Sequence, residues 1–207
     1  MSDPSEVSVQ TAGPGQTELV AEILADAFGA DPVMQWICRD PAYPRWVWRL
    51  LVPLLVPYKE VYVTGDGLGA AVWLPPGVSR DMLPNLDALM GAMGRFGLGA
   101  VFRLFQFIGI LEKHHPKESH YYLLAVGVRS AAQGRGIGSV LLGHVLEKCD
   151  RRGAGAYVEC SSSRSLSLYQ RHGFETQRQI ALPRSGPALW LMYRQPHAAQ
   201  PGASEPK

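Results

Sequence analysis

The hydrophobic positions of this chain change between a two-residue and a helical period, and Gly and Pro separate the segments. Residues 121–128 form an apolar run rich in β-branched and aromatic side chains, which predicts a buried strand. Residues 137–145 carry apolar side chains at i, i+3, i+4 and i+8, the spacing of one face of an amphipathic helix. Between the two lies a glycine-rich turn, residues 133–139 (Gln-Gly-Arg-Gly-Ile-Gly-Ser). A strand followed by such a turn and a helix is typical of anion-binding sites.

Periodicity and turn residues predict further elements along the chain. Strands are expected at residues 7–10, 61–64, 69–74, 157–160, 176–182 and 188–194, and helices at 17–28, 45–56, 84–93, 98–113 and 137–152, with a short helix that Ser165 caps or begins. Gly-Asp-Gly-Leu at 65–68 predicts a turn that joins two of these strands into an antiparallel hairpin. The helices at 84–93 and 98–113 are expected to be loosely joined, because each of four nearby glycines weakens a helix by up to ~1 kcal/mol.

The turn at 133–139 has the features of a phosphate site. The free N–H groups of the first helical turn point outward, the helix dipole favours negative charge, and glycines let a phosphate approach the backbone. Arg135 adds a cation. The turn is therefore predicted to bind a pyrophosphate.

Two other phosphate-binding motifs fit this turn less well. The dinucleotide fingerprint, G-x-G-x-x-G directly after a strand, is nearly matched by Gly134, Gly136 and Ser139. Glu159 stands about 20 positions on, where that fingerprint has an acidic residue. However, five residues separate the strand from the first glycine, and the third glycine comes one place early. The near match therefore leaves a dinucleotide oxidoreductase as a remote alternative. A P-loop is excluded, because no Lys-Ser/Thr pair follows the last glycine.

Two segments resemble the signatures of a known family. Residues 128–138 resemble the acetyl-CoA signature of the GNAT superfamily of N-acetyltransferases, in which Q/R-x-x-G-x-G/A follows the fourth strand. Residues 168–174 resemble its second signature, a short helix of pattern Y-x-x-x-G-F, in the family's order and spacing. The resemblance covers about residues 61–194, and three further segments are similar to the puromycin N-acetyltransferase-like subgroup: 71–73, 114–118 and 157–161.

The resemblance implies an α/β (α+β) fold with a mixed, mostly antiparallel central sheet of about seven strands. Helices are expected on both faces, and the fourth and fifth strands are expected to splay apart. Residues 1–195 would form one N-acetyltransferase domain, with 75–118 as a helical insertion over the acceptor site and 196–207 as a disordered tail.

The resemblance also implies an acetyl-CoA-dependent N-acetyltransferase. The acetyl group would pass to a primary amine of a small, antibiotic- or xenobiotic-like molecule by direct attack on the thioester. A protein or peptide N-acetyltransferase stays open as an alternative, and so does a non-catalytic acyl-CoA-binding regulatory module.

The resemblance assigns a set of residues to acetyl-CoA, which is expected as a cosubstrate. The strand end would pair with the pantetheine arm and the turn would bind the pyrophosphate, while Ser165 stands where the family usually has an Asn. The predicted contacts are Val126, Gly127, Val128, Gln133, Gly134, Arg135, Gly136, Ile137, Gly138, Ser139, Ser165 and Tyr169. Gly127 suits the bulge that splays the strands. The backbone N–H of Val128 is the candidate to polarise the thioester carbonyl.

The candidate catalytic groups are Tyr169 as the acid and three alternatives for the base. The position of Tyr169 in the second signature matches the family's general acid. A phenol with a pKa near ~10 is protonated at neutral pH, so it can protonate the leaving thiolate. The base stays open between His120, Tyr122 and Glu159: the first two alternate on one strand face, and Glu159 lies on the neighbouring strand. Histidine titrates near neutral pH, which suits a base. Glu159 can equally bind the cationic acceptor.

The acceptor pocket is expected between the helices of the first third of the chain and the glycine-rich insertion. Trp36, Trp73 and Tyr122 are the aromatic candidates for its wall. His114 and His115 are expected to line its mouth or face solvent. No paired ligand motif predicts a metal.

Composition limits the remaining function classes. A chain of 207 residues, 46% hydrophobic and 18% charged, can bury one well-packed domain. A net charge of +2 gives no argument for a nucleic-acid partner. The three cysteines form no metal pattern and no even disulfide set, which favours buried thiols in a reducing cytoplasm.

The chain start and two apolar stretches bear on localisation. The first residues have neither the basic start nor the apolar core of a signal peptide. Residues 47–56 are too short to span a bilayer, and 96–111 contain Arg103 and Gln106. We therefore expect a cytoplasmic protein that is not embedded in a membrane, as a monomer or homodimer.

Overall fold

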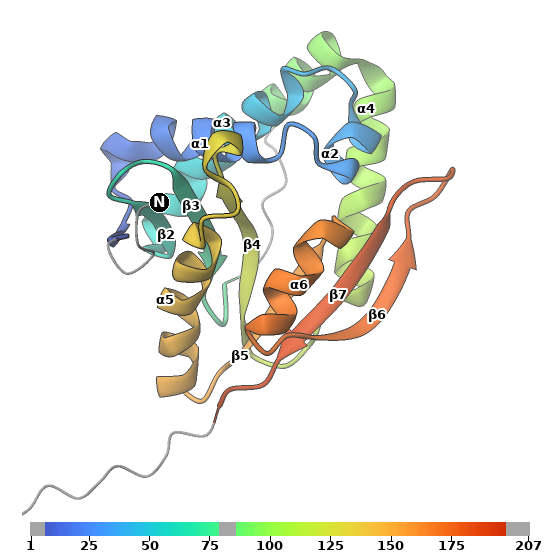
Figure 1. Ribbon diagram of the computed structural model, residues 1–207. Helices are drawn as coiled ribbons and strands as arrows, with labels where there is room; N and C mark the ends of the chain where they lie inside the picture. Colours follow the sequence, from blue (N-terminus) through green and yellow to red (C-terminus); the bar gives the residue numbers. More distant parts are fainter. Residues whose placement is uncertain (1–6, 79–85, 198–207) are drawn as a thin grey trace, which may run out of the picture.

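The computed structural model describes residues 7–78 and 86–197. It contains a seven-stranded sheet of order β1-β2-β3-β4-β5-β7-β6, drawn in Figure 1. The strands are β1 (Val9–Thr11), β2 (Val61–Thr64), β3 (Gly69–Leu74), β4 (His120–Val128), β5 (Gly155–Cys160), β6 (Glu175–Ala181) and β7 (Ala188–Arg194). Neighbouring strands are antiparallel except β4 and β5, which are parallel.

The helices cover both faces of this sheet. They are α1 (Thr17–Ala27), α2 (Pro32–Ile37), α3 (Tyr43–Leu55), α4 (Leu86–His114), α5 (Ile137–Arg151) and α6 (Ser163–Arg171). On one face, α1 and α3 pack on β2–β4 through a core that includes Leu24 and Val52. On the other face, α5 and α6 pack through a second core that includes Leu141 and Tyr169. The predicted fold class, a mixed and mostly antiparallel seven-stranded sheet with helices on both faces, is confirmed.

The parallel strands β4 and β5 separate along their length. Their pairing runs only from His120 opposite Gly155 to Leu123 opposite Val158. β4 then continues to Val128 with no β5 partner in the described part of the chain. Figure 1 shows the two strands diverging toward this end. The predicted splay between the fourth and fifth strands is therefore confirmed.

The short helix α2 was absent from the prediction, although the other described elements begin and end close to where the sequence places them. Asp31 caps α2: its Oδ1 accepts hydrogen bonds from the backbone N–H groups of Val33 (2.9 Å) and Met34 (3.0 Å). Pro32 occupies the first turn. An Asp-Pro pair is a typical helix start, but six residues are too few for periodicity to reveal a helix. The predicted helix start at residue 84 lies outside the described residues.

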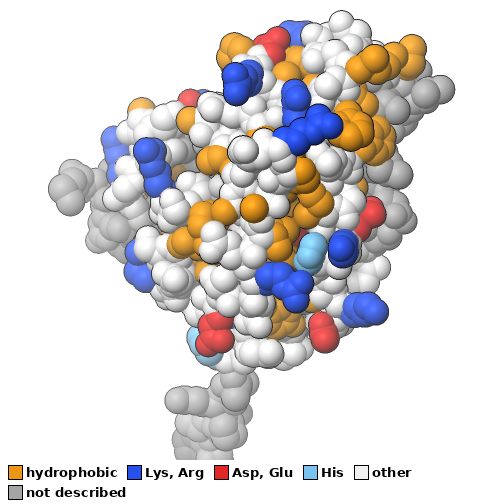
Figure 2. Space-filling model, turned by 90° about the vertical axis from the view of Figure 1, so that its right-hand side faces the viewer, with side chains coloured by type: hydrophobic (Ala, Val, Ile, Leu, Met, Phe, Trp, Pro, Cys, Tyr) orange, Lys and Arg blue, Asp and Glu red, His pale blue; other side chains and the backbone are white. Residues whose placement is uncertain are grey.

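α4 consists of two helices that meet at Gly97, whose φ is 81°. The predicted break between 93 and 98 is confirmed, because a left-handed residue interrupts a right-handed helix. By length and composition alone, Met90–His114 is the one stretch within the described residues that is long and apolar enough to cross a membrane. Hydrophobic and basic side chains gather on the face shown in Figure 2. The large hydrophobic side chains that α4 exposes are Met90, Leu98, Phe102 and Phe105.

Candidate active site

The turn between β4 and α5 is exposed and permits a close approach to its backbone. Gly134 and Gly136 have φ values of 79° and 83°, a left-handed conformation that glycine adopts without strain. α5 begins at Ile137 with Gly136 as its N-cap, and no side chain caps it. The first turn of α5 contains no acidic residue. The helix N-terminus is therefore left open to an anion.

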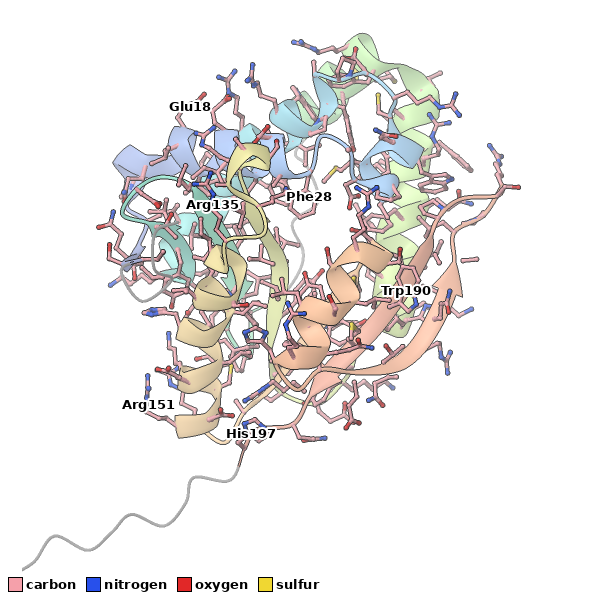
Figure 3. All side chains as sticks on the ribbon, in the orientation of Figure 1. Glu18, Phe28, Arg135, Arg151, Trp190 and His197 are labelled. Carbon is pink, nitrogen blue, oxygen red and sulfur yellow. The ribbon has the colours of Figure 1, made fainter. Side chains whose placement is uncertain are left out.

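Two side chains of the turn bond back to the main chain. Gln133 Nε2 donates to the carbonyl of Val128 at 3.1 Å, which fixes the turn against the end of β4. Arg135 donates to the carbonyl of Ala131 at 3.1 Å. Figure 3 shows Arg135 at the start of α5, with Arg151 at the far end of the same helix. Arg135 thus adds positive charge at the end of α5 where the dipole is already positive.

The β-bulge of β4 lies at Leu124 and not at Gly127, which corrects the prediction. Val72 of β3 pairs with Ala125 and Trp73 pairs with Leu123, so Leu124 is the extra residue. Gly127 pairs regularly with Ala70 of β3. The bulge falls one residue beyond the last β4–β5 pair, where the strands begin to separate.

Close packing of α1 explains the glycine at 127. A Cβ atom at this position would lie 2.7 Å from the Cβ of Ala27 and 3.0 Å from Cδ2 of Leu24. Real Cβ contacts are almost never that short, so any side chain would push α1 away from β4. Gly127 therefore sets the distance between the helix and the strand end.

α6 places Tyr169 in the core between the helix and the sheet. Ser162 caps this helix by accepting the N–H of Arg164, so the prediction that Ser165 caps or begins it is wrong. Ser165 lies in the first turn and donates its N–H to the carbonyl of Ser162. Tyr169 is buried, and its ring packs edge-on against Phe174 at a centroid distance of 5.8 Å.

The phenol of Tyr169 is held in its protonated form. Burial raises its pKa far above the ordinary value for tyrosine. Cys160 and Asp31 raise it further, since a negative charge on either would repel a phenolate. A buried, protonated phenol can donate its proton to the sulfur as the C–S bond breaks.

An apolar cavity of about 220 Å³ lies where α1, α2, α3 and α4 meet the splayed strands. Most of its wall is aromatic or aliphatic. Phe28, visible near the centre of Figure 3, lies at its edge. The side chains that form the apolar wall include Met34, Tyr43, Trp46, Trp48, Leu51, Leu104, Phe107, Ile108, Leu111 and Tyr122. A pocket with such walls and few polar groups is typical of a small-molecule site.

Two carboxyl groups and their partners supply the polar part of the cavity at the sheet. Glu159 of β5 accepts a hydrogen bond from the hydroxyl of Tyr122 on β4. Asp31 accepts a hydrogen bond from the hydroxyl of Ser161, which follows β5. All four residues line the cavity. Burial raises the pKa of Asp31, while the hydrogen bonds from Ser161, Met34 and Val33 lower it and only partly offset the burial.

Comparison with known proteins agrees with this geometry. Residues 99–174 match the Acetyltransferase (GNAT) family. An uncharacterized N-acetyltransferase of Schizosaccharomyces pombe is 27% identical over 195 residues, covering 85% of this chain and 78% of that protein. Both matches support a GNAT superfamily N-acetyltransferase. They support an acetyltransferase, and acetyl-CoA is the cosubstrate that the GNAT family uses.

Solved structures show the same GNAT fold. An acetyltransferase of Corynebacterium glutamicum, described as histone acetyltransferase HPA2 and related acetyltransferase, superposes with a TM-score of 0.67 at 24% identity, covering 94% of this chain and 98% of that one. The Drosophila melanogaster polyamine N-acetyltransferase, which forms N-acetylagmatine, superposes with a TM-score of 0.69 at 18% identity. That match covers 92% of this chain and 100% of the other.

The GNAT fold brings some predicted site residues together and separates others. Tyr122 and Glu159 meet at the cavity as predicted. Trp73 does not line it: the side chain is fully buried in the core under α5, because strand alternation turns it to the opposite face of the sheet. Trp36 is also absent from the wall, and its Nε1 donates to the carbonyl of Pro183 at 3.2 Å. His120 lies outside the wall as well, on the strand that carries Tyr122.

Sequence reasoning missed two residues of this GNAT site. Asp31 lines the cavity, and its only signal in the sequence is the Asp-Pro pair that caps α2. The sequence predicts that His115 lines the mouth or faces solvent, but the side chain contacts both His120 and Glu159. Its position depends on how the α4–β4 loop folds over the parallel strands, which no local pattern encodes.

Proposed function

We propose that this GNAT enzyme transfers the acetyl group of acetyl-CoA to a primary amine of a small molecule with an apolar body. The observation that carries the proposal is the cavity, whose aromatic and aliphatic wall ends at Glu159 and Asp31 on the sheet side. An apolar wall favours an apolar body, and the two carboxyl groups favour a cationic head. Antibiotic- or xenobiotic-like amines, which the puromycin-like resemblance suggests, fall within this class.

The acetyl-CoA site is proposed on the other side of the splay. The turn at 133–139 fits a pyrophosphate because its glycines take positive φ and the N-terminus of α5 is uncapped. The backbone of Val126, Gly127 and Val128 would pair with the pantetheine arm, since no strand occupies that edge in the described chain. The backbone N–H of Val128 would donate a hydrogen bond to the thioester carbonyl, and Ser165 would contact the pantetheine arm.

In the proposed reaction, Glu159 accepts a proton on the acceptor side and Tyr169 donates one on the acetyl-CoA side. Glu159, at the cavity, takes a proton from the ammonium so that the amine nitrogen can attack the acetyl carbon. As the new C–N bond forms, the C–S bond breaks and the sulfur leaves as a thiolate. Tyr169 supplies the proton that the thiolate takes up, and the second proton, which the nitrogen loses once it is acylated, restores the phenol of Tyr169. Water is excluded from the attack by the aromatic wall.

The cavity distinguishes this proposal from polyamine acetylation. The Drosophila relative forms N-acetylagmatine, and agmatine carries a charge at each end. Here the acidic groups at the cavity lie mostly at one end, on β5 and at Asp31, while the walls from α3 and α4 are apolar apart from Glu112. An amine with one cationic end and an apolar remainder matches this distribution of charge.

The test is an assay of the full chain with acetyl-CoA and a panel of amines, followed through the free thiol released. Arylalkyl and alkyl monoamines should be acetylated faster than spermidine or agmatine at equal concentration. A faster reaction with lysine- or N-terminus-bearing peptides would instead favour a protein acetyltransferase. Binding of acetyl-CoA without thiol release for any amine would favour a regulatory module and overturn the proposal.

A further inference from the structure

His115 lies in the loop between α4 and β4 and contacts both parallel strands. Its Nε2 is 3.1 Å from Nε2 of His120 on β4. Its Nδ1 is 3.7 Å from Oε1 of Glu159 on β5. The His115 ring packs edge-on against Tyr122 and Tyr157, each at a centroid distance of 5.1 Å. These contacts fix the plane of the ring, so its two nitrogens face two different partners.

A backbone carbonyl determines which ring nitrogen of each histidine carries the hydrogen. Nδ1 of His120 is 2.6 Å from the carbonyl oxygen of Glu118, which can only accept, so Nδ1 carries the hydrogen. In the neutral ring, Nε2 of His120 then has a lone pair and must accept from Nε2–H of His115. Neutral His115 therefore has its own lone pair on Nδ1. That lone pair faces the carboxyl group of Glu159.

The exposed fractions of the side chains indicate the direction in which a proton would pass along these groups. The side chain of Glu159 is 4% exposed, whereas that of His115 is 19% exposed. Tyr122 donates its hydroxyl to Oε2 of Glu159, which leaves Oε1 on the side of His115. A proton that reaches Glu159 from the cavity thus has a more exposed acceptor next to it. The 3.7 Å separation exceeds a hydrogen bond, as is common for catalytic pairs before substrate binds.

We propose that His115 relays the acceptor's proton from Glu159 to solvent, and that His120 is a positioning residue that holds His115 in the required tautomer. The inference rests on the proposed function. The ammonium N–H bond breaks and nitrogen keeps the electron pair. The proton passes to Oε1 of Glu159, then to Nδ1 of His115, and the resulting imidazolium loses a proton to water. Glu159 returns to the carboxylate and is ready for the next amine.

The groups that contact the relay come from three neighbouring strands. His115 is faced by His120 and Tyr122 from β4 and by Tyr157 and Glu159 from β5. His120 is also faced by Tyr193 of β7, at a centroid distance of 6.1 Å. Among these contacts, Glu159 is the carboxyl group placed to exchange a proton with His115.

The kinetic test compares two acceptors in the variants His115→Gln, His120→Gln and the control His114→Gln. His114 is the neighbouring histidine, but its Nδ1 bonds to the carbonyl of Ile110 at 2.9 Å. For an alkylamine that is protonated at pH 7, His115→Gln should lower kcat/KM by about 10²-fold, the lower range for general base catalysis. An aromatic amine that is neutral at pH 7 needs no deprotonation before it attacks the thioester, so its kcat/KM should stay near the wild-type value.

The pH profile separates a relay from a structural role. In His115→Gln, kcat/KM for the alkylamine should keep rising with pH until the amine itself is neutral, and His120→Gln should show the same trend with a smaller loss. His114→Gln should follow the wild type. Equal losses for both acceptors at every pH, in a variant that still binds acetyl-CoA, would overturn the relay.

Nitrogen NMR of the histidine rings tests the geometry without any turnover. The neutral wild-type protein should show His120 as the Nδ1–H tautomer and His115 as the Nε2–H tautomer, and His120→Gln should leave His115 as a mixture. A neutral His115 with its hydrogen on Nδ1 overturns the proposal. If no amine is acetylated by the wild type, the proposed function fails instead, and the NMR result still decides whether the histidine chain exists.

Discussion

Tyr169 and Asp31 are two titratable groups whose burial favours the neutral form. Burial raises both pKa values: for Tyr169, Cys160 and Asp31 raise it further, and for Asp31 burial outweighs the hydrogen bonds that stabilise the carboxylate. For Tyr169 this keeps the proton in place until a thiolate appears. For Asp31 it means that ionisation costs free energy of folding, which a binding site can tolerate when it must attract a cation.

Tyr169→Phe should lower turnover and leave acetyl-CoA binding nearly unchanged, because only the proton donor is lost. General acid catalysis contributes roughly 10²–10⁴-fold, so kcat should fall by that range. Steady-state kinetics with saturating amine measure the loss, and calorimetry with acetyl-CoA is the control. A variant that keeps more than about half of the wild-type rate removes Tyr169 from thiolate protonation.

Asp31→Asn should stabilise the fold near neutral pH and have little effect in acid. The folded pKa of Asp31 is raised, so its contribution to stability is fully present below the unfolded pKa and is lost as pH rises through the folded pKa. Asn stays neutral and still caps α2 well, so the variant avoids that loss. Thermal unfolding at pH 7 and near pH 3 measures the difference. A lower Tm than wild type at pH 7 contradicts the prediction.

At the scale of elements, the sequence predicts what local patterning encodes. The strand at 121–128, the break near Gly97 and the closing hairpin follow from periodicity and glycine positions, and the fold class follows from family resemblance. Contacts between distant elements are not encoded in this way. The position of Trp73 on the far face, the packing of α1 on Gly127 and the contact of His115 with β5 depend on register and on loop course.

Gly127→Ala should destabilise the protein by about 1–3 kcal/mol, because the new methyl group overpacks the α1–β4 contact. Ala27→Gly should restore part of this loss, since Ala27 Cβ is the atom the new methyl would meet at 2.7 Å. Urea unfolding of both single variants and the double variant measures the coupling.

A control for this cycle is Gly143→Ala, in α5. A Cβ atom there meets no other atom within 4 Å, so this change should raise stability by roughly 0.5–1 kcal/mol through helix propensity. If Gly127→Ala is as stable as wild type, α1 does not require glycine at this position.

Arg135→Gln should weaken acetyl-CoA binding about two- to fivefold, the range for an exposed charge contact. The loss should shrink at high salt, because solvent ions screen exposed charges. Arg151→Gln is the matched control, since Arg151 lies at the other end of α5 and its nearest carboxylate is Glu147 at 3.9 Å. Calorimetric titrations at low and high salt measure both variants. Equal effects of the two changes contradict a phosphate site at the helix N-terminus.

At the scale of the whole molecule, the sheet consists of two parts that meet at the parallel strands. β1–β4 form one part and β5–β7 the other, and only four residue pairs join β4 to β5. The cavity and the proposed acetyl-CoA site both lie where this junction opens. In the proposed function, this splay gives the two substrates space to meet from opposite sides.

Acetyl-CoA should stabilise the protein through this junction. At about 100 times its Kd it should add about 2.7 kcal/mol to the free energy of unfolding. Hydrogen exchange should locate the effect: amides of residues 124–128 that face the splay should be protected together with those of the turn at 133–139, because the pantetheine arm would replace the missing strand. Amides of α3 should change only when the amine is added. Protection confined to the turn would mean that the arm does not lie along β4, and the splay would then need another explanation.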